Sequence, residues 1–316
     1  MLTIETADEG KRLDNLLARY ARHQPRDYLY RLIRTGQVRL DKKRAKASTR
    51  VVAGQLLRLP PHFFTDDQAP GKPPDSLLAE AWKSVVHEDD HLVLVNKPAG
   101  MPVHAGSGHS FGVVELLRAV MNSEEGGRAR FPELVHRIDR LTSGCLLLAK
   151  DATALNELQQ LWRERRVAKT YLALVHRHLN KPQSVELPLL VSEQEGGKRV
   201  VVDYGSGKSA TTRIVPLSQG MMTHTPVTLV RCLPESGRMH QLRVHCQSIG
   251  HPIVGDPLYQ NRKQHQWSAR LLGESLMLHA AELQFNWRGD EYAFSAPGAE
   301  RLTEDVAFDE SPAKVK

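Results

Sequence analysis

A proline-rich stretch early in the chain is the feature that most constrains the fold. Residues 60–75, PPHFFTDDQAPGKPPD, contain five prolines and no apolar periodicity. Proline lacks the backbone donor and disfavours helix in the residue before it, so such a stretch is typical of a linker between folding units. The sequence therefore predicts a small domain over residues 1–62, a linker over 63–82, a large domain over 83–305 and a disordered polar tail over 306–316.

The small N-terminal domain is strongly basic. Residues 11–58 hold 14 lysines and arginines against three aspartates, a net charge of +11, whereas the whole chain carries +7. Clustered positive charge predicts a partner rich in phosphate, because each neutralised phosphate releases counterions. A merely solvated charged face and an anionic membrane surface are the alternatives.

The apolar residues of this domain are spaced for a folded core. They recur at helical spacing over residues 13–20 and again over 29–33, before Gly36, which predicts two short helices. Residues 38–41 and 55–59 predict two strands, which a membrane-bound amphipathic helix would lack. The cations off the apolar stripe, Arg31 and Arg34, are expected to join the basic turn Lys42, Lys43 and Arg44 in one surface.

The larger domain contains apolar runs of strand length that alternate irregularly with helical segments. Expected strands are residues 85–86, 92–95, 145–149, 171–175, 228–233 and 242–245, and a helix is expected over 155–162. These segments lack the regular strand-helix rhythm of a doubly wound sheet. We therefore expect an α+β fold.

Several common chemistries have little support in the sequence. The three cysteines form no CxxC pair, and the histidines and cysteine of residues 240–251 match no metal motif. The glycine-rich segment 106–112 lacks the end of a Walker loop, and Leu141 replaces the first glycine of a GxSxG elbow around Ser143. We expect no cofactor and no metal. No apolar stretch reaches the roughly 18 residues of a membrane span, so we expect a cytoplasmic protein.

Three clusters are candidates for chemistry: residues 134–144 (LVHRIDRLTSG), 169–173 (KTYLA) and 237–246 (GRMHQLRVHC). In the first, Arg137 and Arg140 flank Asp139 and would keep its carboxylate ionised, as a nucleophile or an electrostatic stabiliser requires. A structural ion pair or a turn would suit the same residues equally well. A lone tyrosine in a strand, such as Tyr171, usually packs, and the third cluster has too many donors for an ordinary strand.

Taken in order, these clusters resemble the motifs of the RluA family of RNA pseudouridine synthases. Residues 136–144, 169–173 and 237–245 are similar to its first, second and third motifs, and residues 96–100, 251–256 and 278–280 are similar to further signatures. Ile138, Met239 and Gln260 depart from the usual leucine, threonine and glycine, and none of these changes removes an ionisable group. The resemblance implies a catalytic domain built on a mixed, largely antiparallel sheet.

The resemblance also implies a reaction and roles for residues. Uridine in RNA is isomerised: its N-glycosidic bond breaks, and the uracil turns and rejoins the ribose through carbon. Asp139 is implied as the catalytic carboxylate, Arg243 as the partner that holds its charge, and Tyr171 as the residue that stacks on uracil or transfers a proton. Leu242 would pack beside the base, and Arg137 would occupy the gap left by a flipped-out uridine.

The N-terminal segment resembles the S4 RNA-binding domain, including its opening Arg12-Leu13-Asp14. The residues expected to hold RNA are Arg12, Arg31, Arg34, Lys42, Lys43 and Arg44. With this domain and its length, the chain is similar to members that act on large-subunit (23S) ribosomal RNA, so we expect that RNA or its precursor as partner and a monomeric enzyme.

Three alternatives remain at this point. One is a synthase that acts on tRNA, and another is a non-catalytic RNA-binding factor in ribosome assembly. The third is a glycoside or nucleoside hydrolase, which normally uses two acids in concert. The three clusters contain a single carboxylate, that of Asp139.

Overall fold

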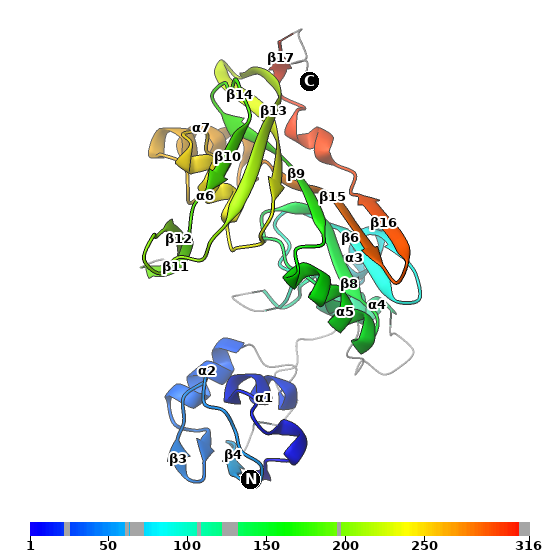
Figure 1. Cartoon of the computed structure of the whole chain (residues 1–316), viewed down its shortest axis with the longest axis vertical. Helices are drawn as coiled ribbons and strands as arrows, with labels where there is room; N and C mark the ends of the chain where they lie inside the picture. Colours follow the sequence, from blue (N-terminus) through cyan, green and yellow to red (C-terminus); the bar gives the residue numbers. More distant parts are fainter. Residues whose placement is uncertain are drawn as a thin grey trace. The chain divides into compact units, whose positions relative to one another are not determined.

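The computed structural model describes residues 1–21, 26–60, 63, 73–105, 109–121, 132–194 and 197–309 (Figure 1). The chain divides into two compact units, Met1–Asp75 with His104–Glu115 and Ser76–Val103 with Leu116–Lys316. Among the described residues, no helix has both the length and the apolar character needed to cross a membrane.

The N-terminal unit packs two helices against a small antiparallel sheet with the strand order β1-β4-β2-β3. Its elements are β1 (Leu2–Thr3), the 3-10 helix η1 (Thr6–Asp8), α1 (Leu13–Tyr20), α2 (Arg26–Arg34), β2 (Arg39–Leu40), β3 (Lys43–Arg44) and β4 (Leu56–Arg58). The apolar faces of both helices are buried together with Val38 and Leu57. Gly36 follows α2 with a positive φ of 74°, a conformation that ends a helix and favours glycine. The two helices and two strands predicted here are confirmed.

The larger unit is built on one long sheet with the order β10-β13-β14-β9-β15-β8-β6-β5. In addition, β16 pairs with β15, β17 with β13 and β7 with β8. Among the described pairings of this sheet, only β15 with β8 is parallel, so the predicted mixed, largely antiparallel sheet is confirmed. Figure 1 shows β9, β13, β14 and β15 as its long strands.

The remaining bounds are as follows. The helices are α3 (Asp75–Lys83), α4 (Val113–Met121), α5 (Ala152–Arg163), α6 (Gln241–Ser248), α7 (Arg262–Leu272) and the 3-10 helix η2 (Ala299–Leu302). The sheet strands are β5 (Val85–Glu88), β6 (Leu92–Lys97), β7 (Glu133–Leu134), β8 (Ser143–Ala149), β9 (Ala168–His176), β10 (Gln183–Glu186), β13 (Thr211–Met222), β14 (Thr225–Pro234), β15 (Leu278–Trp287), β16 (Asp290–Ser295) and β17 (Ala307–Phe308). A separate hairpin consists of β11 (Leu189–Gln194) and β12 (Gly197–Val202).

The strand predictions hold where continuous apolar runs are buried on both faces of the sheet. Residues 92–95, 145–149 and 173–175 have no exposed surface, and they lie within β6, β8 and β9. Short continuous apolar runs are the pattern expected for fully buried strands. The predicted helix over residues 155–162 is also confirmed, as α5.

One predicted strand is wrong. Residues 242–245 lie in helix α6, whose residues from Gln241 to Cys246 are all buried. Leu242 and Cys246 face the main core, whereas Val244 packs in a second cluster with Tyr259. A helix buried on all sides shows no amphipathic period, so its alternating apolar residues imitate a strand.

The structure also corrects the ends of the predicted linker and tail. Residues 75–82, expected in the linker, begin helix α3, which buries Ala81. Residues 307–308, expected in the disordered tail, form β17 by pairing with Gly220 and Met221 of β13. Strand β17 depends on this contact with a distant segment. The rest of the predicted tail, from residue 310, lies outside the described residues.

Candidate active site

Asp139 lies in the loop between β7 and β8. The chain turns there, because the Thr142 amide donates to the Asp139 carbonyl at 3.0 Å. Gly144, near the start of β8, has a φ of +105°, and a Cβ at this position would lie 2.2 Å from the carbonyl oxygen of Ala280. Only glycine fits such a close approach of two strands. The contact anchors the end of the loop against β15.

Lys97 holds the same loop through hydrogen bonds to backbone carbonyls. Its side chain is fully buried, and its ammonium group donates to the carbonyls of Pro98, Met101 and Arg140 at 2.8, 2.9 and 2.9 Å. Burial lowers the pKa of Lys97 to about 7. Because the Arg140 carbonyl also accepts from the Gly100 amide at 2.8 Å, the loop after β6 is tied to the residue that follows Asp139.

His136 anchors the other side of the loop. Its ring stacks on Trp162 with centroids 4.7 Å apart, and its Nε2 accepts from the Leu147 amide at 3.1 Å. Burial lowers the pKa of His136 to about 3. The imidazole is therefore neutral at physiological pH, as an acceptor must be, and its position indicates a structural role.

Arg243 projects from α6 and joins two carboxylates. Its Nε and Nη2 donate to the two oxygens of Asp256 at 2.8 Å each, and its Nη1 makes a longer bond of 3.4 Å to Oδ2 of Asp139. Burial opposes the charge of Arg243, but the bonds to Asp256 and the nearby aspartates outweigh it, so its pKa is raised. The bidentate pairing with Asp256 fixes the plane of the guanidinium. One nitrogen is left to face Asp139.

His240 approaches Asp139 from the start of the same helix. It has a positive φ of 51°, and its Nε2 lies 3.8 Å from Oδ2 of Asp139. Its Nδ1 lies 2.8 Å from the Tyr259 hydroxyl, which accepts from the Val200 amide at 2.9 Å. The Tyr259 hydroxyl can therefore donate its proton to Nδ1 of His240. In that arrangement Nε2 of His240 carries the ring hydrogen, which faces Asp139. Burial lowers the pKa of His240 and outweighs the charge of Asp139.

Asp139, His240 and Arg243 line one pocket. Its lining includes every residue that the resemblance assigns to the site in the larger unit: Arg137, Asp139, Tyr171, Leu242 and Arg243. The Asp139 side chain is 23% exposed, whereas that of Arg243 is 4% exposed, so a ligand can reach the carboxylate while the arginine stays behind it. Among the described lining residues, Asp139 is the only carboxylate.

The pocket can hold a planar, partly apolar ring beside an anion. Leu242 and Leu278 provide apolar walls, and Tyr171 adds an aromatic ring from β9. Burial, and then the charge of Asp139, raises the pKa of the Tyr171 hydroxyl, which is therefore protonated at neutral pH. Arg137 is exposed at the pocket. In the part of the chain that the structure describes, no group of three histidine, cysteine or acidic side chains is placed to hold a metal ion.

Sequence reasoning missed one contact of Arg243 and one of Asp139. Asp256, fully buried, holds Arg243, and His240 approaches the carboxylate directly. Asp256 belongs to the 251–256 signature, but nothing in its local sequence indicates an ion pair with α6. His240 was within the third cluster, and its proximity to Asp139 depends on the left-handed turn that starts the helix.

The basic residues of the N-terminal unit fall into two groups. Arg31, Arg34, Lys42, Lys43 and Arg44 are all exposed. A Cβ on Gly36 would lie 2.9 Å from Nε of Arg44, so the β2–β3 hairpin lies against the end of α2, the helix that holds Arg31 and Arg34. Arg12 is different, because it forms an ion pair with Asp14 at 2.8 Å.

Comparison with known proteins agrees with this architecture. Residues 91–248 match the family of RNA pseudouridylate synthases, and residues 11–57 match the S4 domain. The ribosomal large subunit pseudouridine synthase C of Vibrio cholerae serotype O1 is 42% identical over 87% of this chain and 85% of its own length. The protein of that name from Escherichia coli K12 is 42% identical over 90% of this chain and 88% of its own.

Solved structures give the same result. Human RNA pseudouridylate synthase domain containing 1 superposes with a TM-score of 0.57 at 25% identity, over 72% of this chain and 88% of the human chain. Human RNA pseudouridylate synthase domain containing 4 gives a TM-score of 0.56 at 26% identity, over 70% and 90%. The chain belongs to the family of RNA pseudouridylate synthases and carries an N-terminal S4 domain.

Proposed function

We propose that this enzyme isomerises specific uridines of large-subunit (23S) ribosomal RNA to pseudouridine, with Asp139 as its catalytic carboxylate. The observation that carries the proposal is the pocket in which Asp139 is accessible and faces a buried arginine at 3.4 Å. The choice of RNA rests on relatives named for the large ribosomal subunit that are 42% identical to this chain. The proposal places the enzyme in the cytoplasm as a monomer.

In this mechanism Asp139 works as an anion beside the ribose. The glycosidic bond from C1′ to N1 breaks, the uracil turns and a bond from C1′ to C5 forms; C5 then loses its proton and N1 gains one, so the product is an isomer of the substrate. Arg243 keeps the carboxylate directed into the pocket, through the bond of 3.4 Å from its Nη1 to Oδ2 of Asp139. Tyr171 and Leu242 contact the base from either side while it turns.

The target uridine has to leave its stack to reach Asp139. Extruding a nucleotide costs a few kcal/mol, on the order of one stacking and pairing interaction. Arg137 lies at the pocket two residues before Asp139 and is exposed. Its flat guanidinium can stack in the space that the base vacates. We assign it the role of stabilising the flipped-out state.

A hydrolase is disfavoured by the state of the second carboxylate. Asp256 is fully buried, and its oxygens accept from Arg243 and from the amides of Leu258 and Tyr259. It has no free oxygen to protonate a leaving group or to activate water. The paired acids that glycoside hydrolysis normally requires are therefore not provided by Asp139 and Asp256.

We expect the exposed cations of the S4 domain to hold RNA through phosphate. The variant Lys42→Gln/Lys43→Gln should bind an unmodified 23S transcript about 30-fold more weakly at 150 mM salt, and the slope of log affinity against log salt should fall by about 2. Filter binding across a salt series measures both quantities. Lys11→Gln is the matched control, because the Lys11 charge is already paired with Asp8 at 2.7 Å. An unchanged slope for the double variant would contradict the assignment.

Mapping of modified positions tests the proposed substrate. RNA from a strain that lacks this gene, treated with carbodiimide and read by primer extension, should lose discrete stops in 23S rRNA, and a plasmid copy should restore them. Loss of stops in tRNA alone would show that the substrate class is wrong. If the stops in every RNA persisted and purified enzyme released no tritium from C5-labelled uridines, the non-catalytic alternative would be favoured.

A further inference from the structure

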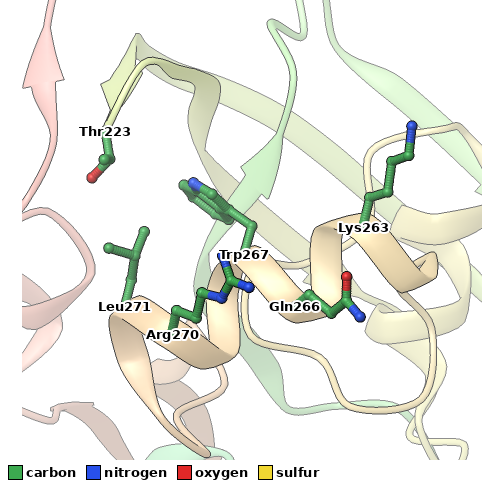
Figure 2. Close-up of a pocket in the computed structure, with 6 residues that line it drawn as sticks. All are labelled: Thr223, Lys263, Gln266, Trp267, Arg270 and Leu271. Carbon is green, nitrogen blue, oxygen red and sulfur yellow. The ribbon is translucent and has the colours of Figure 1, made fainter.

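A second groove of the larger unit lies away from the candidate active site (Figure 2). It is lined by Lys263, Gln266, Trp267, Arg270 and Leu271 of α7 and by Thr223 from the turn between β13 and β14. Figure 2 shows the Trp267 ring projecting from α7 toward the turn that holds Thr223. None of these residues belongs to the Asp139 pocket.

The sequence of α7 arranges these side chains in rows. Lys263, Trp267 and Leu271 are spaced four apart and share one face of the helix, and Gln266 and Arg270 form the neighbouring row. A capping box between Asn261 and Gln264 fixes the start of the helix. The groove is therefore a regular surface of a well-formed helix.

The groove carries the positive charge of two side chains, Lys263 and Arg270. The helix sequence RKQHQWSARLL contains no acidic residue, and within the described residues neither Lys263 nor Arg270 takes part in an ion pair. Both cations are exposed. From the opposite side the groove meets Thr223, which is uncharged. This charge suits an anionic ligand.

Trp267 adds an aromatic surface to this charge. One side of its ring packs against His176, with centroids 5.3 Å apart, and the residue also contacts the main core. It is nevertheless only partly buried. Core packing accounts for the inner edge of the indole, but it does not account for the unpaired cations beside the outer edge. Aromatic rings flanked by cations are typical of surfaces that stack bases and bind phosphates.

The sheet relates this groove to the active site. Tyr171 lines the catalytic pocket, and His176, which contacts Trp267, lies five residues further along the same strand β9. At about 3.3 Å per residue the two positions are roughly 17 Å apart. That distance corresponds to about five base steps of a duplex.

We propose that the α7 groove is a second RNA-binding site, at which Trp267 stacks on a base and Lys263 and Arg270 hold neighbouring phosphates of the substrate RNA. The proposal rests on the proposed RNA substrate but not on the identity of the catalytic carboxylate. The groove would hold a segment several nucleotides from the target uridine, and it would thereby contribute to the choice of site on a large RNA.

Neutralising the groove cations tests the proposal in the full-length protein. Lys263→Gln and Arg270→Gln should each weaken binding of an unmodified 23S transcript about fivefold at 150 mM salt and lower the salt slope by about 1. The matched control is Arg262→Gln, on the same helix and also exposed but outside the groove lining. The loss in the logarithm of its affinity for the transcript should be less than half of that for either groove variant.

The stacking role is tested separately at Trp267. Trp267→Leu should weaken binding about tenfold, and Trp267→Phe, which keeps an aromatic ring, should recover most of the loss. Thermal melting of each variant identifies any loss of fold, and the cation variants test the groove independently of this side chain. The readout is binding, so it is separate from any failure to form pseudouridine.

If both cation variants bound the transcript as Arg262→Gln does, the proposal would be overturned in favour of an acidic protein surface as the partner.

Discussion

Asp139→Asn should abolish pseudouridine formation while RNA binding is retained. The substitution keeps the size of the side chain and removes its charge, so the pocket keeps its shape but loses the anionic oxygen beside the ribose. Loss of a group that acts directly on the substrate lowers the rate by more than about 10³-fold. Tritium release from C5-labelled uridines in a 23S transcript, measured under single-turnover conditions, gives the rate.

The control for this prediction is an aspartate of similar chemistry at another site. Asp90 is exposed at the turn between β5 and β6. The variant Asp90→Asn should release tritium at the same rate as the enzyme without substitutions. Filter binding shows whether Asp139→Asn still binds the transcript. A rate within tenfold of the unmodified enzyme would contradict the role assigned to Asp139.

Arg243→Met should produce the largest loss of stability among the site variants. The change leaves Asp256, which is fully buried, without its counter-charge, and breaking a buried ion pair in this way costs about 3–5 kcal/mol. It also removes the charge that faces Asp139 at 3.4 Å. Denaturant unfolding should show the loss, and tritium release should fall with it.

A double variant separates the two effects of Arg243. Arg243→Met/Asp256→Leu removes both buried charges and should regain a large part of the stability, because a buried pair replaced by apolar residues is often neutral. Activity should stay low, since Asp139 still lacks its partner. If the double variant recovered full activity, Arg243 would be only a structural residue. If Arg243→Met unfolded at the same denaturant concentration as the original protein, the ion-pair account would be wrong.

Much of the fold follows from local sequence patterns. The strands with residues 92–95 and 145–149 are continuous apolar runs, and α5 has a regular apolar face, so each pattern identifies its element directly. Helix α6 could not be identified in this way, because it is buried on every side. Strand β17 is two residues long and exists only through pairing with β13, a contact that no local pattern contains.

The candidate site was predictable to a similar extent. The residues of the three clusters could be identified by their chemistry and by family resemblance, and the structure brings Asp139, Tyr171 and Arg243 to one pocket. Asp256 was not predictable as the main partner of Arg243, because the family resemblance assigns Asp139 as the carboxylate that Arg243 faces. The geometry shows instead that Arg243 is held by Asp256 and presented to Asp139.

The most direct test of this account is an experimental structure of the Asp139→Asn variant bound to an RNA that contains its target uridine. The account predicts that the uridine is out of its stack, with its base between Tyr171 and Leu242 and its ribose in contact with residue 139, at a separation of about 3–3.5 Å. Arg243 should still be held by Asp256. A uridine that remains stacked in the RNA, or a base that lies outside this pocket, would contradict the account.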